Sequence, residues 1–347
     1  MGGLDQALID AIIEYQIDLR RVEAGTVKSV LNILTRMQNE LVVTLSSQTP
    51  LTEFNKARKA DLLRQVTAVL NKYYLTAQGE LALSTDGLAQ AQAEHTVRTL
   101  NTTLAISTGA SLPSEAVLTR LADNILIEGG PLASWWQRLA TDTSFKLSNA
   151  IRQGIVQGET NAQIIARVVG KAGQPGIMEI AKRNAAAVVQ TATQAIANDA
   201  RLKTFESNAD VVLQLEWFSA LDSHVCPRCM ALSGKKWLNS RDGTHAPVGH
   251  SVPFQSPPIH FNDRCVMLPI TKLSAFMPKG TRASEGGQVP SSTTFDDWLS
   301  RRTPAQQDEQ LGVGRAQMWR DKKITLAQLI DGKGRELTLS QLQAKYK

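Results

Sequence analysis

The stretch "ADVVLQLEWFSALDSHVCPRC", residues 209–229, marks the point where the pattern of the sequence changes. Apolar residues alternate in its first half, which predicts a strand that leads into a turn. That turn carries Cys226 and Cys229. Whether these thiols form a metal site, a redox pair or part of a buried core decides which class of protein this is. The alternation is formed by Val211, Leu213, Leu215 and Trp217.

The residues before this stretch have the three- and four-residue apolar spacing of amphipathic helices. We expect long helices over about residues 55–83 and 88–106, and an alanine-rich helix over residues 177–206. Thr160 is placed to cap a further helix that stops at Gly170. The sequence therefore predicts a mainly α fold with an extended helical body, made of an N-terminal region (1–110) and a helical lead-in (111–207).

The residues after Asn208 are expected to form a small irregular α+β module over 208–275. From Cys226 to Pro269 the chain is rich in Gly, Pro, Ser and His and has little periodicity. Such a segment forms a poor hydrophobic core by itself, so it needs a cross-link such as a metal or another part of the chain to pack against. We expect a flexible linker over 276–294 and a short helical C-terminal tail over 295–347.

The cysteine spacing points to zinc. Cys226 and Cys229 are separated by two residues in a turn, as is the first ligand pair of a zinc knuckle. The later stretch "PPIHFNDRC", residues 257–265, adds His260 and Cys265. Three sulfurs and one imidazole suit a closed tetrahedral structural zinc site, and metal binding can supply folding energy to a segment with little core.

Two other interpretations of the cysteines stay open. A CxxC pair can be a thioredoxin-like redox site, which requires a strand before it and a helix N-terminus at the first cysteine within a βαβ unit. The thiols can also be unligated core residues. A disulfide framework is not expected, because the chain has only three cysteines.

A metal-dependent nuclease or processing enzyme is a further alternative. His245 or His250 would act as the base, close to His260, Asn262 and Asp263. The zinc set would use His260, however, and this leaves no carboxylate partner at motif spacing. The sequence also lacks phosphate-binding, dinucleotide-binding and HExxH motifs. We therefore expect no catalytic residues.

The charge and the hydropathy of the sequence indicate which partners the protein can contact. The formal net charge is +6, and from Thr271 onward thirteen Lys and Arg face eight Asp and Glu. This basic C-terminal region favours contact with a polyanion such as packaged double-stranded DNA, through its phosphates. There is no apolar run long enough for a membrane span and no signal-peptide pattern. We expect a protein that needs no membrane.

The cysteine region resembles the phage head morphogenesis family, the Mu F-like minor head proteins. The likeness runs from "TATQAIANDARLKTFE" through the CPxC pair to "SPPIHFNDRCVMLPI", and more weakly over about residues 145–340. Asp263 departs from the family pattern, because it stands where the family has the first of two closing cysteines. If that position is the ligand, Asp263 would bind through a carboxylate oxygen. The other matching motif positions are Trp217, Asp222, Gly234, Pro258, Asn262 and Arg264.

The resemblance implies a structural minor capsid protein of a tailed phage. Such a protein would lie inside the head at or near the portal, after assembly in the host cytoplasm, and would act in head assembly and DNA packaging. Its expected partners are the portal protein and the major capsid or scaffold protein. An internal virion protein that is ejected with the DNA is the alternative within this class.

Overall fold

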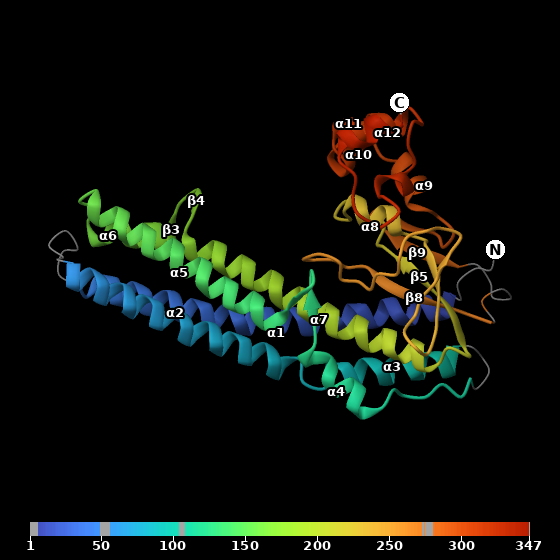
Figure 1. The fold of residues 1–347 in the computed structure, drawn as a ribbon, viewed down its shortest axis with the longest axis horizontal. Helices are drawn as coiled ribbons and strands as arrows, with labels where there is room; N and C mark the ends of the chain where they lie inside the picture. Colours follow the sequence, from blue (N-terminus) through green and yellow to red (C-terminus); the bar gives the residue numbers. More distant parts are fainter. Residues whose placement is uncertain (1–5, 49–55, 104–107, 273, 275–279, 347) are drawn as a thin grey trace. The chain divides into compact units, whose positions relative to one another are not determined.

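The structure is a computed structural model that describes residues 6–48, 56–103, 108–272, 274 and 280–346 (Figure 1). It is mainly helical, as expected, and its small sheets are antiparallel. The chain divides into two compact units. The first unit contains residues 1–17, 88–121 and 194–347, and the second contains residues 18–87 and 122–193. These units differ from the predicted boundaries because single long helices contribute residues to both.

The second unit is built from long helices that run side by side (Figure 1). Their apolar residues recur at three- and four-residue steps, as in the buried series Val30, Leu34, Met37 and Leu41. The predicted helix boundaries lie within one residue of those observed for α2 and α7. The helices that contribute to this unit are α1 (Gln6–Ser46), α2 (Lys56–Ser84), α5 (Leu132–Val156), α6 (Asn161–Val169) and α7 (Ile177–Ser207).

Specific contacts fix the helices of this unit against one another. The hydroxyl of Tyr74 on α2 lies 2.8 Å from that of Thr143 on α5, in a buried contact. Thr160 caps α6 through a reciprocal pair of hydrogen bonds with Gln163, and the helix stops at Gly170, as predicted. Short strand pairs turn the chain between helices: β1 (Leu126–Ile127) with β2 (Gly130–Pro131), and β3 (Gly170–Lys171) with β4 (Gln174–Pro175).

The first unit contains a four-stranded antiparallel sheet in the order β7-β6-β5-β8. The predicted strand is β5, but a bulge between Val212 and Gln214 changes which side chains are buried. Val212 is therefore buried and Leu213 is exposed, contrary to a simple alternation. The strands are β5 (Val212–Phe218), β6 (Lys236–Leu238), β7 (Pro247–Val248) and β8 (Val266–Thr271).

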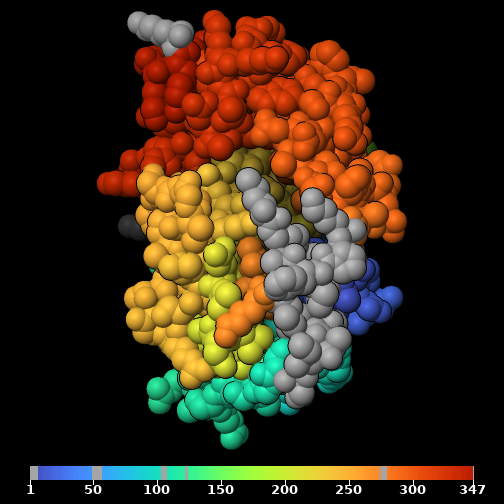
Figure 2. Space-filling model, turned by 90° about the vertical axis from the view of Figure 1, so that its right-hand side faces the viewer, coloured from blue at the N-terminus to red at the C-terminus, as the bar shows by residue number. Residues whose placement is uncertain are grey.

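Helices pack on this sheet and share its core. The N-terminal turns of α1 contribute Leu8 and Ile12, and α7 contributes Leu202 and Phe205. The predicted C-terminal tail is helical, and its residues join the same cluster of buried side chains. Figure 2 shows the tail as red atoms that lie directly against the gold-coloured atoms of the preceding module. The remaining helices of the unit are α3 (Leu88–Thr103), α4 (Glu115–Asp123), α8 (Pro227–Leu232), α9 (Phe295–Ser300), α10 (Pro304–Leu311), α11 (Val313–Arg320), the 3₁₀ turn η2 (Leu326–Leu329) and α12 (Leu339–Lys345).

This shared core corrects one expectation about residues 226–269. The segment is not poor in core, because Met230, Leu232, Trp237 and Leu268 are all buried in the cluster. Isolated apolar residues in an irregular segment show no periodicity, yet the sheet and the C-terminal helices gather them into one core. A metal is thus not the sole source of order here.

The predicted linker over 276–294 is also corrected. Residues 281–290 form a β-hairpin of β9 (Thr281–Ser284) and β10 (Gly287–Pro290), while residues 276–279 lie outside the described part of the chain. Arg282 is buried, donates hydrogen bonds to the carbonyls of Ser219 and Thr293, and stacks 4.1 Å from the centre of the Phe218 ring. These long-range contacts hold a polar segment that has no strong strand pattern of its own.

Candidate metal centre

Strand β5, the loop after it and helix α8 place the two neighbouring cysteines. Cys226 is the residue that caps α8, and its sulfur accepts a hydrogen bond from the backbone N–H of Cys229 at 3.3 Å. Pro227 follows at the first helical position, where its missing N–H costs nothing. The turn therefore brings both sulfurs to one side, as the CxxC spacing predicts.

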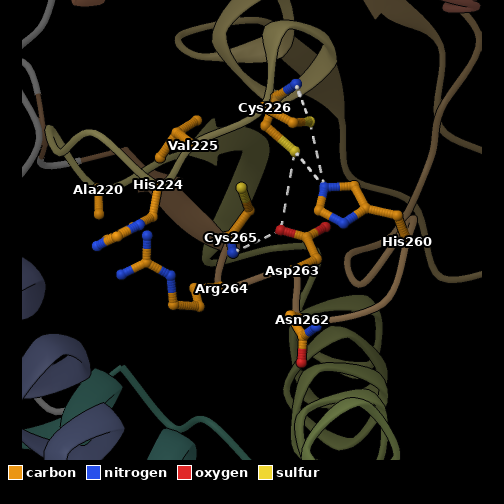
Figure 3. Close-up of a pocket in the computed structure, with 10 residues that line it drawn as sticks. Ala220, His224, Val225, Cys226, His260, Asn262, Asp263, Arg264 and Cys265 are labelled. Carbon is orange, nitrogen blue, oxygen red and sulfur yellow. Dashed lines mark hydrogen bonds between the residues drawn. The ribbon is translucent and has the colours of Figure 1, made fainter. Parts of the chain in front are cut away.

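His260 faces both of these sulfurs (Figure 3). Its Nε2 atom lies 3.2 Å from the sulfur of Cys226 and 3.3 Å from that of Cys229. Its other ring nitrogen, Nδ1, donates to the carbonyl of Phe261 at 2.8 Å. A hydrogen bond from Nδ1 to a carbonyl fixes the tautomer in which the lone pair of Nε2 can bind a metal.

The donor atoms fit a tetrahedral ion. Zinc binds sulfur at about 2.3 Å and imidazole nitrogen at about 2.0 Å, so tetrahedral angles separate the two donors by about 3.5 Å. The observed separations from His260 to the two sulfurs are within a few tenths of an ångström of this value. The donor atoms of Cys226, Cys229 and His260 all lie within 4.8 Å of one another. The three residues could hold zinc between them.

The fourth predicted ligand lies in a second, overlapping group. Donor atoms of Cys229, Asp263 and Cys265 are within 4.8 Å of one another, but the four predicted ligands do not share one such group. The sulfur of Cys265 lies 3.3 Å from the hydroxyl of Ser219, in a buried contact. The structure thus brings Cys226, Cys229 and His260 together and places Cys265 beside Cys229 only.

The thiols and the imidazole influence one another's protonation. Hydrogen bonds from Cys229 and His260 lower the pKa of Cys226 to about 4, although burial opposes this. The same contact with Cys226 raises the pKa of His260 to about 9. The pKa of Cys229 is raised, because it hydrogen-bonds Cys226 and Cys265 and is buried, and burial raises the pKa of Cys265. Cys226 is therefore the most easily ionised of the three thiols.

The other motif residues hold the loops that carry the ligands. Arg264 donates to the carboxylate of Asp222 at 2.7 Å, which ties the loop after His260 to the loop before Cys226. Asn262 has φ of 61°, a left-handed conformation that Asn tolerates, and so turns the chain between His260 and Asp263. Pro258 follows a cis peptide bond in the approach to this turn.

Trp217 and Gly234 connect the metal region to the sheet. Trp217 is fully buried on β5, and its indole N–H donates to Ser219 at 3.1 Å. Gly234 has φ of 80°, and its N–H donates to the carbonyl of Trp217 at 2.8 Å. Glycine is required at such a turn because other side chains strain there. Sequence reasoning missed Ser219, since no motif spacing marks it.

His245 and His250 lie outside the metal group, and both of their rings are fully engaged. Nδ1 of His250 accepts from the N–H of Val252, so its Nε2–H donates to the carbonyl of Lys236. His245 faces the carbonyl of Leu238 through Nδ1 and the carboxylate of Glu206 through Nε2. Neither ring offers a free nitrogen to activate water in this geometry.

The structure meets only some of the requirements of a thioredoxin-like redox site. A strand precedes the CxxC pair and a short helix starts at it, but the sheet around it is antiparallel and contains no βαβ unit among the described residues. Both thiols are free. His260, which the thioredoxin-like arrangement does not require, faces both sulfurs. The geometry favours a metal over a dithiol couple.

The fold and the site together define a mainly helical protein whose small sheet carries a Cys/His cluster. A family model described as phage Mu protein F like protein matches residues 145–268, from helix α5 to strand β8. This match confirms the resemblance of the sequence to the Mu F-like proteins over this part of the chain. No curated protein and no solved structure matches the chain significantly.

Proposed function

We propose that this protein is a minor capsid protein of a tailed phage that acts in head assembly and DNA packaging, inside the head at or near the portal. Its partners are then the portal protein and the major capsid or scaffold protein. The observation that carries the proposal is the Mu F-like match over residues 145–268, which covers every residue of the candidate metal centre.

The proposed role of the metal centre is structural. Zinc would be held by Cys226, Cys229 and His260 and would cross-link the loop after β5 to the loop before β8. Bound zinc supplies a rigid cross-link rather than a reaction, because each ligand is fixed and the neighbouring histidines are engaged elsewhere. A rigid loop surface suits docking on another virion protein.

The composition and DNA content of phage heads test the assembly role directly. Heads are purified from phage with the intact gene and from phage in which the gene is deleted, and both are analysed by mass spectrometry and electron microscopy. We expect the protein in wild-type heads at few copies, and fewer DNA-filled heads after deletion. Normal numbers of filled heads, together with absence of the protein from them, would reject the proposal. Absence of the protein from emptied particles would favour the alternative role, in which the protein is ejected with the DNA.

The DNA contact is a separate part of the proposal. Lys322, Lys323 and Lys333 are exposed on the C-terminal helical region, and phosphate contacts of such residues carry no sequence preference. We expect binding of double-stranded DNA that weakens steeply with salt and weakens further in a Lys322→Glu/Lys323→Glu variant. Equal binding by the variant would remove DNA from the partners of this region.

A further inference from the structure

We propose that Asp263, and not Cys265, supplies the fourth ligand of the metal centre. This inference rests on the proposed zinc site and names a ligand that the sequence favours less. The result is a centre with two sulfurs, one imidazole nitrogen and one carboxylate oxygen.

The first observation concerns the hydrogen-bonding of Cys265. The hydroxyl of Ser219 accepts from the indole N–H of Trp217 at 3.1 Å and donates its only proton to the carbonyl of Cys229 at 3.1 Å. The contact of 3.3 Å between Ser219 and the sulfur of Cys265 then requires the thiol to be the donor. Coordination by Cys265 would therefore cost a hydrogen bond that this buried sulfur donates to Ser219.

The second observation concerns the carboxylate of Asp263. Asp263 is only 3% exposed, and none of the ion pairs formed by the described residues includes it. The adjacent guanidinium of Arg264 is turned to Asp222 instead. A buried carboxylate that forms no direct ion pair is costly. A metal cation at the sulfurs of Cys226 and Cys229 would provide a direct partner.

The third observation is that Asp263 is already aimed at the site (Figure 3). Its Oδ1 atom lies 3.8 Å from the sulfur of Cys229, close to the separation of two donors on one zinc ion. Backbone N–H groups of Cys265 and Ile259 donate to Oδ1 and Oδ2, each at 2.9 Å. Oδ1 also accepts from the thiol of Cys229, whose proton a bound metal would replace, so these bonds orient the carboxylate toward the metal position.

The ligand set follows from these contacts. Coordination by Cys265 requires loss of its bond to Ser219 and leaves the Asp263 charge buried. Coordination by Asp263 keeps the Ser219 network and neutralises that charge. A small closing movement of the Asp263 loop is needed in either case, because the two donor groups share only Cys229.

Zinc K-edge X-ray absorption of the purified wild-type protein tests the inference without any substitution. We expect two sulfurs at about 2.3 Å and two lighter atoms at about 2.0–2.2 Å. Three sulfurs and one lighter atom would overturn it while leaving the zinc site intact. Protein that binds no zinc would instead overturn the proposed metal centre itself, so the two failures are distinguishable.

Two variants with matched controls complete the test. Asp263→Asn should raise the zinc dissociation constant at least about tenfold, and Cys265→Ala should raise it less, with folding of both followed by circular dichroism. A larger loss in Cys265→Ala would overturn the inference. Asp263→Cys should increase the sulfur count from two to three; a count that stays unchanged would contradict the placement of residue 263 at the metal.

Discussion

The guanidinium of Arg264 lies 2.7 Å from the carboxylate of Asp222, across 42 residues of sequence. Asp222 also accepts the backbone N–H of His224 at 2.9 Å, so one carboxylate fixes both loops that border the metal centre. Burial opposes ionisation of Asp222, but these hydrogen bonds outweigh it and lower its pKa. The pair is therefore a brace between the two ligand-bearing loops.

Removal of this brace should destabilise the protein measurably. We expect Arg264→Ala to lower the free energy of unfolding by about 1–3 kcal/mol, because it leaves the half-buried carboxylate of Asp222 unpaired. The matched control is Arg241→Ala, which breaks a largely exposed ion pair with Asp210 and should cost under about 1 kcal/mol. Urea unfolding measures both. Equal losses in the two variants would show that the brace carries no special role.

The pair of Glu206 and His245 gives a pH-dependent prediction. Burial opposes ionisation of Glu206, but hydrogen bonds from His245 and Lys203 lower its pKa below the ordinary 4.5. Since the lowered pKa belongs to the folded state, the stabilisation is complete above about pH 4.5 and is lost as the pH falls through the folded value.

Unfolding free energies of wild type and Glu206→Gln should therefore converge on acidification. We expect wild type to exceed the variant by about 1–3 kcal/mol at neutral pH, with the difference shrinking below pH 4.5. A difference that is independent of pH from 7 to 3 would contradict the assigned charge of Glu206.

Packing in the helical second unit depends on Gly154. A Cβ atom there would lie 2.6 Å from Cδ1 of Ile164, so α5 and α6 approach closely only at a glycine. We expect Gly154→Ala to destabilise the protein by about 1–3 kcal/mol. Gly79→Ala on α2 is the control, because nothing lies within 4 Å of its added Cβ, and it should stabilise by about 0.5–1 kcal/mol. Thermal unfolding measures the stability of both variants. An unchanged stability of Gly154→Ala would show that the two helices can separate at no cost.

The nuclease alternative predicts an activity that the geometry of the histidines does not support. We expect no cleavage of double-stranded or single-stranded DNA by the protein with magnesium, manganese or zinc. Both ring nitrogens of His250 and of His245 already face partners, so neither can accept a proton from water. Cleavage that disappears in His245→Ala or His250→Ala would establish the enzyme.

The sequence predicted the helices well and the small sheet only in part. Helices such as α2 and α7 could be predicted because their apolar periodicity lies within one continuous segment of the sequence. The hairpin 281–290 was not predicted because Arg282 holds it through contacts with Ser219 and Phe218, far away in the sequence. The bulge in β5 was missed for the same reason, since the pairing with β8 sets its register.

The candidate site was predicted from the cysteine spacing and the family pattern. The structure adds which donor atoms lie together and which are already engaged by distant residues. The grouping of Cys226, Cys229 and His260 follows from the CxxC turn and from the loop that returns after β7. The competition between Asp263 and Cys265 depends on Ser219, which lies 46 residues from Cys265. No local pattern reveals which of two neighbouring donors a distant hydroxyl has already engaged.

Loss of the metal should loosen the ligand loops and spare the helices. We expect Cys226→Ser, or removal of zinc by a chelator, to increase hydrogen exchange over residues 226–265, because two loops lose their cross-link. Exchange in α2 and α5 should stay unchanged, since their packing lies in the second unit. Equal protection of 226–265 with and without zinc would show that the core alone orders this segment.

Zinc content of the full-length protein, purified without chelators and measured by mass spectrometry of the elements, tests the central claim most directly. The account predicts about one zinc ion per chain, and its loss in the Cys226→Ser/Cys229→Ser variant. Less than about a tenth of an equivalent in the wild-type protein would contradict the claim that Cys226, Cys229 and His260 converge to hold a metal.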